Sequence, residues 1–436
     1  MSKLIQSSIT GSNDTLVYYF DDDSYINQNV DINALQEKID FNFTCPSFRI
    51  YVLFPDENIH YEIPEEDIKP GGSYQENYQN GQRRTLSFQL INETGEYSPN
   101  INKLWIGTRL RLDVGITFQN TTIWFVKGVF VINKITPSLT SGGKEVSISA
   151  NDKYSLFEGG LGKLEKAYTV ESGNDIEEII KSIQSLDLGN GSIFDPKPMI
   201  YHPSLKGKKT QVDISKSAGE TYASILSDLA TQLSAEIFYN TNGNMVLSPV
   251  SEVGKDGDKP LLWSYDVDEG EVSQLNYDYD YDTAINRIIV LGASKNGSVC
   301  EATAVNNDER SPFCYQRIGY RTGDIIQDSN IFTENLAKER AEYELRQKLI
   351  LKTTSTSEII FNPFLSVNNL ISVSSKFYNL VNERFLLQSL NFSLDYSGKM
   401  SITFSNINNL VTNIEIISGN TKKYEVYPVY FSYDKQ

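Results

Sequence analysis

Hydrophobic and polar positions are most regular between residues 217 and 249. Ser217 and Glu220 have the spacing of a capping box, which predicts that a helix begins at Ser217. Apolar side chains then recur at i, i+3, i+4, i+7 and i+11, namely Tyr222, Ile225, Leu226, Leu229 and Leu233. Two short apolar runs flank Asn240-Thr241-Asn242-Gly243, which suits a tight hairpin. The pattern predicts one helix followed by two strands.

Most of the remaining chain alternates with the period of a strand. The clearest runs are residues 85–90, 108–113, 122–132, 146–150, 286–292, 357–361, 370–374, 384–394 and 400–404. Residues 55–82, rich in Glu, Asn, Pro and Gly, are interpreted as loop. Further helices are predicted near 174–186 and 334–351, and the second has one apolar face made of Ala337, Ala341, Leu345 and Leu349. The expected fold class is therefore mainly β with an α+β insertion.

Two hairpins far apart in the chain look alike. Residues 128–152 and 384–406 share a long strand, a Ser-Leu step, a Ser-Gly-(Gly)-Lys turn and a short alternating strand. Chance similarity is the alternative, but duplication of one β-domain is the interpretation we prefer. The predicted domains are a β-domain at 1–157, an α+β domain at 158–255, a second β-domain at 256–415 and an aromatic tail at 416–436.

Composition limits the classes of function. The 436 residues include 26 Tyr and 21 Phe, which favour strands, and a formal net charge of −17 argues against specific binding to nucleic acid phosphates. Cys45, Cys300 and Cys314 form no disulfide framework or metal pattern, so we expect free, buried or half-buried thiols. No run approaches the about 18 apolar residues of a membrane span, and no apolar signal core follows Met1, so cytosolic synthesis is expected.

Residues for catalysis or metal binding are sparse. The only histidines, His60 and His202, lie in no recognisable motif, and no nucleotide-binding or hydrolase motif occurs. Asp278, Asp280 and Asp282 fit the start of a calcium loop, but Thr and Ile occupy the positions that need Gly and Glu. A solvated strand is the preferred interpretation. Paired carboxylates for glycoside hydrolysis stay open, because sequence does not give their separation. We therefore predict no catalytic, cofactor or metal site.

Taken in order, several segments resemble the central baseplate hub protein of phage tails and phage-tail-like bacteriocins, the late-control or tail-associated hub family. They are TLSFQL, WIGTRL, GETYASILSDLATQLSAEIFYNTNGNMVL, NRIIVLG and AKERAEYELRQKL, spread over roughly residues 40 to 415. The resemblance implies two β-domains related to the tail-tube protein. It also implies a homotrimer that presents six such domains as a pseudo-sixfold ring and adapts a sixfold tube to a threefold spike.

The resemblance implies a set of partners and a location. The partners are other copies of the chain, the tail tube protein, the central spike, baseplate wedge or distal tail proteins and the tape measure protein. DNA would pass through the channel without specific binding, so acidic residues are expected to line it. The location would be the virion tail baseplate, after synthesis in the bacterial host cytoplasm. Whether the tail is contractile, and whether it belongs to a phage or a bacteriocin, stays open.

The C-terminal segment lies outside the resemblance. Its strand-like alternation makes Tyr424, Tyr427, Tyr430 and Phe431 candidate partner contacts, through an edge strand added to a partner such as the spike. A strand within its own domain is the alternative.

Two other classes of function are weighed. A tail-associated cell-wall hydrolase is disfavoured, because the chain ends soon after the second β-domain. A receptor- or carbohydrate-binding protein would use exposed aromatic residues, but Trp105, Trp124 and Trp263 lie in or beside strand-like runs and are interpreted as core.

Overall fold

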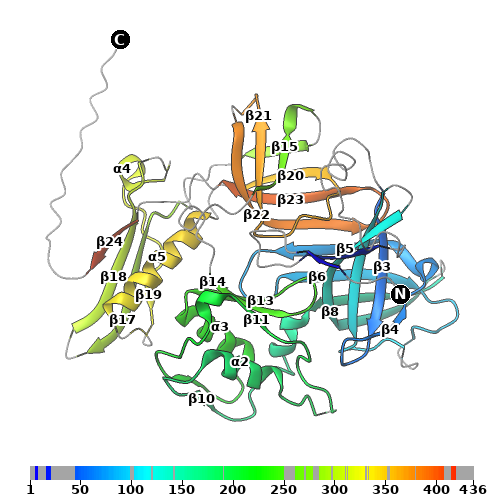
Figure 1. Cartoon of the computed structure of the whole chain (residues 1–436), viewed down its shortest axis with the longest axis horizontal. Helices are drawn as coiled ribbons and strands as arrows, with labels where there is room; N and C mark the ends of the chain where they lie inside the picture. Colours follow the sequence, from blue (N-terminus) through cyan, green and yellow to red (C-terminus); the bar gives the residue numbers. More distant parts are fainter. Residues whose placement is uncertain are drawn as a thin grey trace. The chain divides into compact units, whose positions relative to one another are not determined.

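The computed structural model divides the chain into two compact units (Figure 1). Unit 1 comprises Met1–Thr283 and Leu349–Thr412, and unit 2 comprises Ala284–Lys348 and Asn413–Gln436. The structure describes residues 5–7, 16–20, 45–98, 103–118, 121–140, 143–189, 191–249, 261–269, 272–277, 284–295, 298–309, 311, 313–328, 331, 333–350, 354–378, 380–406 and 414–418. Within these ranges, no helix is long and apolar enough to cross a membrane.

The first β-domain of unit 1 is built from antiparallel strands. They are β1 (Ile5–Ser7), β2 (Leu16–Phe20), β3 (Ser47–Leu53), β4 (Ile59–Glu62), β5 (Ile68–Asn77), β6 (Arg84–Ile91), β7 (Arg109–Phe118), β8 (Thr121–Thr140) and β9 (Gly143–Asp152), with the 3-10 turn η2 (Glu65–Asp67). In β6, Leu86, Phe88 and Leu90 are buried, and the residues between them are more exposed. This is the predicted alternation of a strand with one face on the core.

The second β-domain repeats the strand arrangement of the first. Its elements are β15 (Leu261–Asp266), η5 (Val267–Glu269), β16 (Val272–Tyr277), β20 (Thr354–Ile360), β21 (Leu370–Ser375), β22 (Leu380–Leu394) and β23 (Lys399–Asn406). In the first domain β7, β8 and β9 form a meander, and β9 pairs back to β6. In the second β21, β22 and β23 do the same, and β23 pairs back to β20. The two similar hairpins therefore occupy the same topological place, while their origin by duplication stays a prediction.

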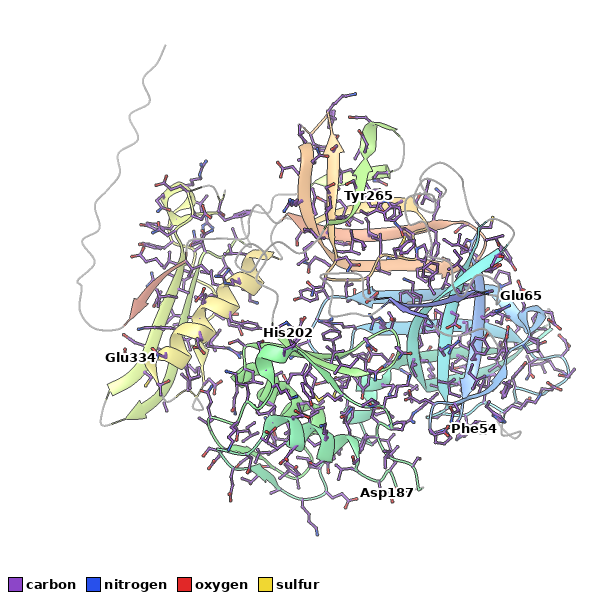
Figure 2. All side chains as sticks on the ribbon, in the orientation of Figure 1. Phe54, Glu65, Asp187, His202, Tyr265 and Glu334 are labelled. Carbon is purple, nitrogen blue, oxygen red and sulfur yellow. The ribbon has the colours of Figure 1, made fainter. Side chains whose placement is uncertain are left out.

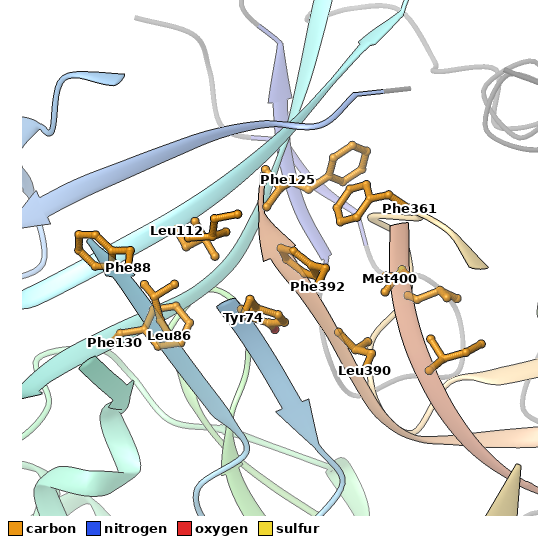
Figure 3. Close-up of a cluster of buried hydrophobic side chains, with 14 of the residues drawn as sticks. Tyr74, Leu86, Phe88, Leu112, Phe125, Phe130, Phe361, Leu390, Phe392 and Met400 are labelled. Atoms are coloured by element: carbon orange, nitrogen blue, oxygen red, sulfur yellow. The ribbon is translucent and has the colours of Figure 1, made fainter. Parts of the chain in front are cut away.

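One sheet runs through both β-domains. Strand β22 pairs with β5 from Ser389↔Asn77 to Leu394↔Gly72, so the order is β16-β20-β23-β22-β5-β6-β9-β8-β7-β3-β4. The core is shared as well (Figure 3): the rings of Tyr74 and Phe392 stack at 4.8 Å, and Phe361 meets Phe392 edge to face at 5.0 Å. The two domains are thus one packed body. The predicted fold class, mainly β with an α+β insertion, is confirmed.

The interpretation of residues 55–82 as loop is wrong, because β4 and β5 lie within it. The inward positions of β5 are Gly72, Tyr74 and Glu76, not aliphatic residues. A side chain at Gly72 would come within 2.5 Å of the Ser87 carbonyl oxygen, so close strand packing requires glycine there.

The α+β part of unit 1 has its own hydrophobic core. Its elements are η3 (Lys153–Phe157), β10 (Tyr168–Val170), α2 (Ile176–Gln184), β11 (Ile200–Tyr201), η4 (Pro203–Leu205), β12 (Ile214–Lys216), α3 (Tyr222–Gln232), β13 (Ala235–Tyr239) and β14 (Met245–Pro249). Ile225 and Leu229 of α3 share this core with Ile180 of α2 and Ile237 of β13. The β13–β14 hairpin turns as predicted, with Gly243 at φ +76°.

Helix α3 begins later than predicted. It starts at Tyr222 with Thr221 as its N-cap, and not at Ser217. Half of the capping-box contact does form, since the Glu220 carboxylate accepts a hydrogen bond from the Ser217 backbone N–H at 2.5 Å. Gly219, at φ +92°, turns the chain away from helical geometry between them. The contact therefore closes a turn before the helix.

Unit 2 packs one helix on a four-stranded sheet. Its elements are β17 (Arg287–Lys295), β18 (Ser298–Asn306), α4 (Tyr315–Ile318), β19 (Ile326–Gln327), α5 (Glu334–Ile350) and β24 (Ile414–Ser418), and the sheet order is β19-β17-β18-β24. Ala337, Ala341, Leu345 and Leu349 of α5 are all buried. This confirms the predicted apolar face of the helix.

Candidate functional site

Unit 1 buries a group of charged side chains where its two β-domains and its α+β part meet. We call this group the charged junction, and its members are Glu57, Glu76, Arg83, Arg84, Arg109, Lys127, Asp152, Lys153, Asp195 and Glu236. Removing charges from water is unfavourable unless they are paired and hydrogen-bonded. The partners of each group therefore show what the junction holds together.

Arg84, at the start of β6, connects all three parts of unit 1. Its Nη2 lies 2.6 Å from Glu76 Oε1 on β5 and 3.4 Å from Ser366 Oγ in the segment before β21. Its Nη1 donates to the Tyr239 carbonyl oxygen of β13. Glu76 accepts two further bonds, from Ser366 Oγ at 2.8 Å and from the Tyr74 hydroxyl at 3.1 Å. One ion pair thus ties four segments together.

A second connection to the second β-domain comes from strand β8. Lys127 Nζ donates to the carbonyl oxygens of Pro363 and Leu365, at 2.6 and 3.1 Å. Both carbonyls belong to the segment that also supplies Ser366. A buried ammonium held by two carbonyls fixes that segment against β8.

Arg83 and Asp152 join β6 to the end of β9 and to the α+β part. Arg83 Nη2 lies 2.8 Å from Glu236 Oε2 on β13. Asp152 Oδ2 accepts the backbone N–H groups of Arg83 and Arg84 at 2.7 and 2.9 Å. Burial raises the pKa of Asp152 to about 6, against the opposing effect of these hydrogen bonds.

Lys153 links the loop after β3 to the α+β part. Its Nζ lies 2.5 Å from both Glu57 Oε1 and Asp195 Oδ1, and it donates to the Gly243 carbonyl oxygen at 2.8 Å. The Tyr239 hydroxyl donates to Asp195 Oδ2 at 2.8 Å, and burial raises the pKa of Tyr239 well above its usual range. The hydroxyl therefore keeps its proton and its role as a donor.

Two more cations complete this contact. Arg109 of β7 donates through Nη2 to the Phe194 carbonyl oxygen at 2.8 Å. Lys197 Nζ lies 3.3 Å from Glu57 Oε2, and burial lowers the pKa of Lys197. The bonds of the charged junction run between elements of the protein, so the arrangement suits a fixed relative position of the three parts better than catalysis.

The predicted partner-contact residues Tyr424, Tyr427, Tyr430 and Phe431 lie outside the described residues, as do Asp278, Asp280 and Asp282. Among the residues that are described, no group of three or more His, Cys, Asp and Glu side chains could hold a metal ion. His202, labelled in Figure 2, caps η4 by accepting the Ser204 N–H. The ring of His60 lies 4.2 Å from that of Phe54.

Tryptophan and cysteine residues meet the expectations in part. Trp124 and Trp263 are buried as predicted, but Trp105 is 49% exposed, so its assignment to the core is wrong. It lies in the turn before β7, where its backbone bonds to Thr108 leave the ring outside the sheet. Cys314 is buried and Cys300 half-buried as expected, whereas Cys45 is exposed, just before β3 begins.

The sequence reasoning missed the charged junction entirely. Its one available signal was the Arg83-Arg84 pair directly before the apolar alternation of β6. Two adjacent cations at the start of a strand are usually solvated. Their carboxylate partner Glu236 lies far along the chain, so their pairing depends on the fold.

No protein-family model matches the chain, and no curated protein sequence matches it. Solved structures do. The 43 kDa tail protein of prophage MuSo2 from Shewanella oneidensis has a TM-score of 0.55 at 14% identity, covering 84% of this chain and 99% of its own. A tail protein from Neisseria meningitidis MC58 has a TM-score of 0.57 at 11% identity, covering 84% and 98%.

A third similar structure comes from the Francisella PdpA-VgrG complex. Its TM-score is 0.50 at 11% identity, and the match covers 93% of this chain and 59% of that one. At such low identities these likenesses establish the fold. The chain therefore has the fold of the two tail proteins over almost their whole length.

Proposed function

We propose that this protein is a structural component of a phage tail or of a related tail-like particle, and that it serves there as the central baseplate hub. In this role three copies form a ring of six β-domains, with the sixfold tail tube on one side and the threefold spike on the other. The proposed neighbours are the tube protein, the spike, wedge or distal tail proteins and the tape measure protein.

The fold carries this proposal. Two tail proteins, one of them from a prophage, share it over 99% and 98% of their own chains. The charged junction supports it further, because a ring of two β-domains per subunit needs a constant geometry between them. The shared sheet and the Arg84–Glu76 pair supply that constancy within one chain.

Tail particles released by the cells that encode the chain provide the test. We expect mass spectrometry of purified particles to detect this protein at three copies per tail, and cryo-electron microscopy to place it at the distal end of the tube. Acidic side chains should then line the channel, since like charge lets DNA slide. Absence of the chain from purified particles would contradict the tail role, and a copy number that is not threefold would contradict the hub.

A further inference from the structure

One lysine of the charged junction has its amine enclosed by two carboxyl groups. Lys153 Nζ lies 2.5 Å from both Asp195 Oδ1 and Glu57 Oε1, and the three side chains are at most 1% exposed. The ring of Tyr239 lies 5.0 Å from Nζ, and Tyr239 belongs to the hydrophobic core of the α+β part together with Phe194. Water is therefore excluded from the amine, and opposite charges are held there at a considerable cost in free energy.

The carboxyl group of Asp195 is held by donors at both of its oxygens. Oδ2 accepts hydrogen bonds from the Tyr239 hydroxyl at 2.8 Å and from Gln184 Nε2 at 3.1 Å. Oδ1 accepts the Lys197 backbone N–H at 2.9 Å in addition to Lys153 Nζ. Fixed donors stabilise negative charge that develops on an oxygen during a reaction. Asp195 is thus prepared for attack by a nucleophile at its carboxyl carbon.

Glu57 is held in a different way. Its backbone has φ +66°, which is uncommon for a residue with a side chain, in a turn closed by its N–H bond to the Phe54 carbonyl oxygen at 2.8 Å. Both carboxylate oxygens are buried, and neither accepts a hydrogen bond of normal geometry from a described residue. Strained backbone and buried acceptors without hydrogen bonds are frequent where a group has a chemical role. Glu57 is therefore available to accept a proton.

We propose that Lys153 and Asp195 join in an intramolecular amide bond, and that Glu57 moves the proton that this reaction requires. One proton of the ammonium passes to Asp195 Oδ1 along their hydrogen bond, which leaves a neutral amine and a carboxylic acid. The amine attacks Cγ of Asp195. As the C–N bond forms, the carbonyl electron pair moves onto Oδ2, where Tyr239 and Gln184 donate.

The second half of the reaction releases water. Glu57 takes a second proton from Nζ and delivers it to Oδ1. The electron pair returns from Oδ2, the Cγ–Oδ1 bond breaks, and Oδ1 leaves as water with the two protons. Glu57 is again a carboxylate. The third hydrogen of Lys153 stays on the amide nitrogen, where it donates to the Gly243 carbonyl oxygen, 2.8 Å from Nζ.

Two features of the site favour the bond. Groups that the fold already holds in contact avoid the entropy loss of being brought together. The reaction also replaces two buried charges by a neutral amide, while Glu57 keeps its charge beside Lys197 and Arg109. The bond closes a covalent loop around α2. It requires only the folded chain, so it does not depend on the tail role.

The intact mass of the full chain, measured under denaturing conditions, tests the bond. We expect wild type to be lighter than its sequence by one water molecule. Lys153→Arg keeps the positive charge but lacks the nucleophilic amine, so it should have the full mass of its sequence. A wild-type chain of full mass would overturn the proposal. So would a loss of water that persists in the Lys153→Arg variant, because it would arise elsewhere in the chain.

Tryptic peptides locate the bond. Trypsin does not cleave after an acylated lysine, so residues 145–163 should remain one peptide, joined to residues 182–206, which contain Asp195. Fragmentation of the joined peptides identifies the carboxyl group that is bound. A bond from Lys153 to Glu57, which is equally near, would show that the roles of the two carboxyl groups are assigned wrongly.

Substitution of Glu57 tests its part in the reaction. Glu57→Gln should leave most of the purified protein without the bond, because loss of a general base slows a reaction about a hundredfold or more. Glu236→Gln is the matched control, since Glu236 is a buried carboxylate paired with Arg83, and this variant should be fully bonded. Glu57→Asp should regain part of the bonded fraction, and thermal unfolding checks that each variant folds. Complete bonding in Glu57→Gln, or equal loss in both glutamine variants, would refute the role of Glu57.

Discussion

The carboxyl group of Asp152 is held in a site where ionisation is unfavourable. Burial raises its pKa to about 6, and the charge of Arg84 and three backbone N–H groups only partly compensate. Since the unfolded chain has an ordinary pKa of about 3.9, the native state binds this proton more tightly than the unfolded state does. The contribution of Asp152 to stability is therefore fully present below about pH 4 and is lost as pH rises through about 6.

Asp152→Asn should remove this pH dependence. The variant is expected to be less stable than wild type at every pH, because the amide NH2 group would face a backbone N–H donor. The difference in the free energy of unfolding between wild type and variant should narrow by about 3 kcal/mol between about pH 4 and 6, and it should stay constant above about pH 7. Urea unfolding of both proteins across this range measures it. A difference that does not change with pH would show that Asp152 has an ordinary pKa.

Individual side chains also explain why the sequence pattern did not predict strand β5 or the charged junction. Strand β5 was missed because Gly72, Tyr74 and Glu76 occupy the inward positions that a search for strands expects to be aliphatic. Each is there for its contacts: Gly72 for close packing, and Tyr74 and Glu76 for the bonds to Arg84 and its neighbours. Those contacts form only in the folded protein, so the sequence does not predict the charged junction either.

Elements with a strong internal pattern were predictable. The apolar faces of α3 and α5 follow from helical spacing alone. The four predicted residues of α5 are buried, as are Ile225, Leu226 and Leu229 of α3, whereas Tyr222 and Leu233 at the two ends of the α3 stripe are half-buried. The start of α3 was not predictable, because two signals within six residues oppose each other. The capping box at Ser217 favours a helix, and Gly219 favours a turn. The turn prevails, since Gly219 adopts a left-handed conformation that a helix does not permit.

Helix α3 should matter for folding and not for partner choice. Leu229 is fully buried in the core of the α+β part, so Leu229→Ala should lower the free energy of unfolding by about 2–5 kcal/mol through lost burial and the resulting cavity. Leu161→Ala, at a residue that is 54% exposed, is the control and should change it by less than about 0.5 kcal/mol. Urea unfolding measures both. Unchanged stability of the Leu229→Ala variant would show that this core does not depend on Leu229.

In unit 1 the three parts were predictable from the sequence, but the way in which they are joined was not. Two β-domains and an intervening α+β part follow from alternation and helical spacing. Their union into one sheet through β5 and β22 does not, because strand pairing between distant segments leaves no local pattern. The buried charges at the meeting point are equally nonlocal, and they make unit 1 a single mechanical body.

If unit 1 is one body, breaking the charged junction should loosen all three of its parts together. Glu76→Gln leaves the Arg84 guanidinium buried beside a neutral partner, which should lower the free energy of unfolding by about 3–5 kcal/mol. Glu358→Gln removes an exposed ion pair, in which Glu358 Oε1 lies 2.6 Å from Lys399 Nζ. This substitution should lower the free energy of unfolding by no more than about 1 kcal/mol. Hydrogen exchange followed by mass spectrometry would locate the effect. We expect faster exchange in β6, β22 and α3 of the Glu76→Gln variant to the same degree, with α5 of unit 2 as internal reference. Faster exchange confined to β5 and β6 would show that the β-domains and the α+β part open independently, and a ring built from such subunits would lack the fixed angle that the hub role requires.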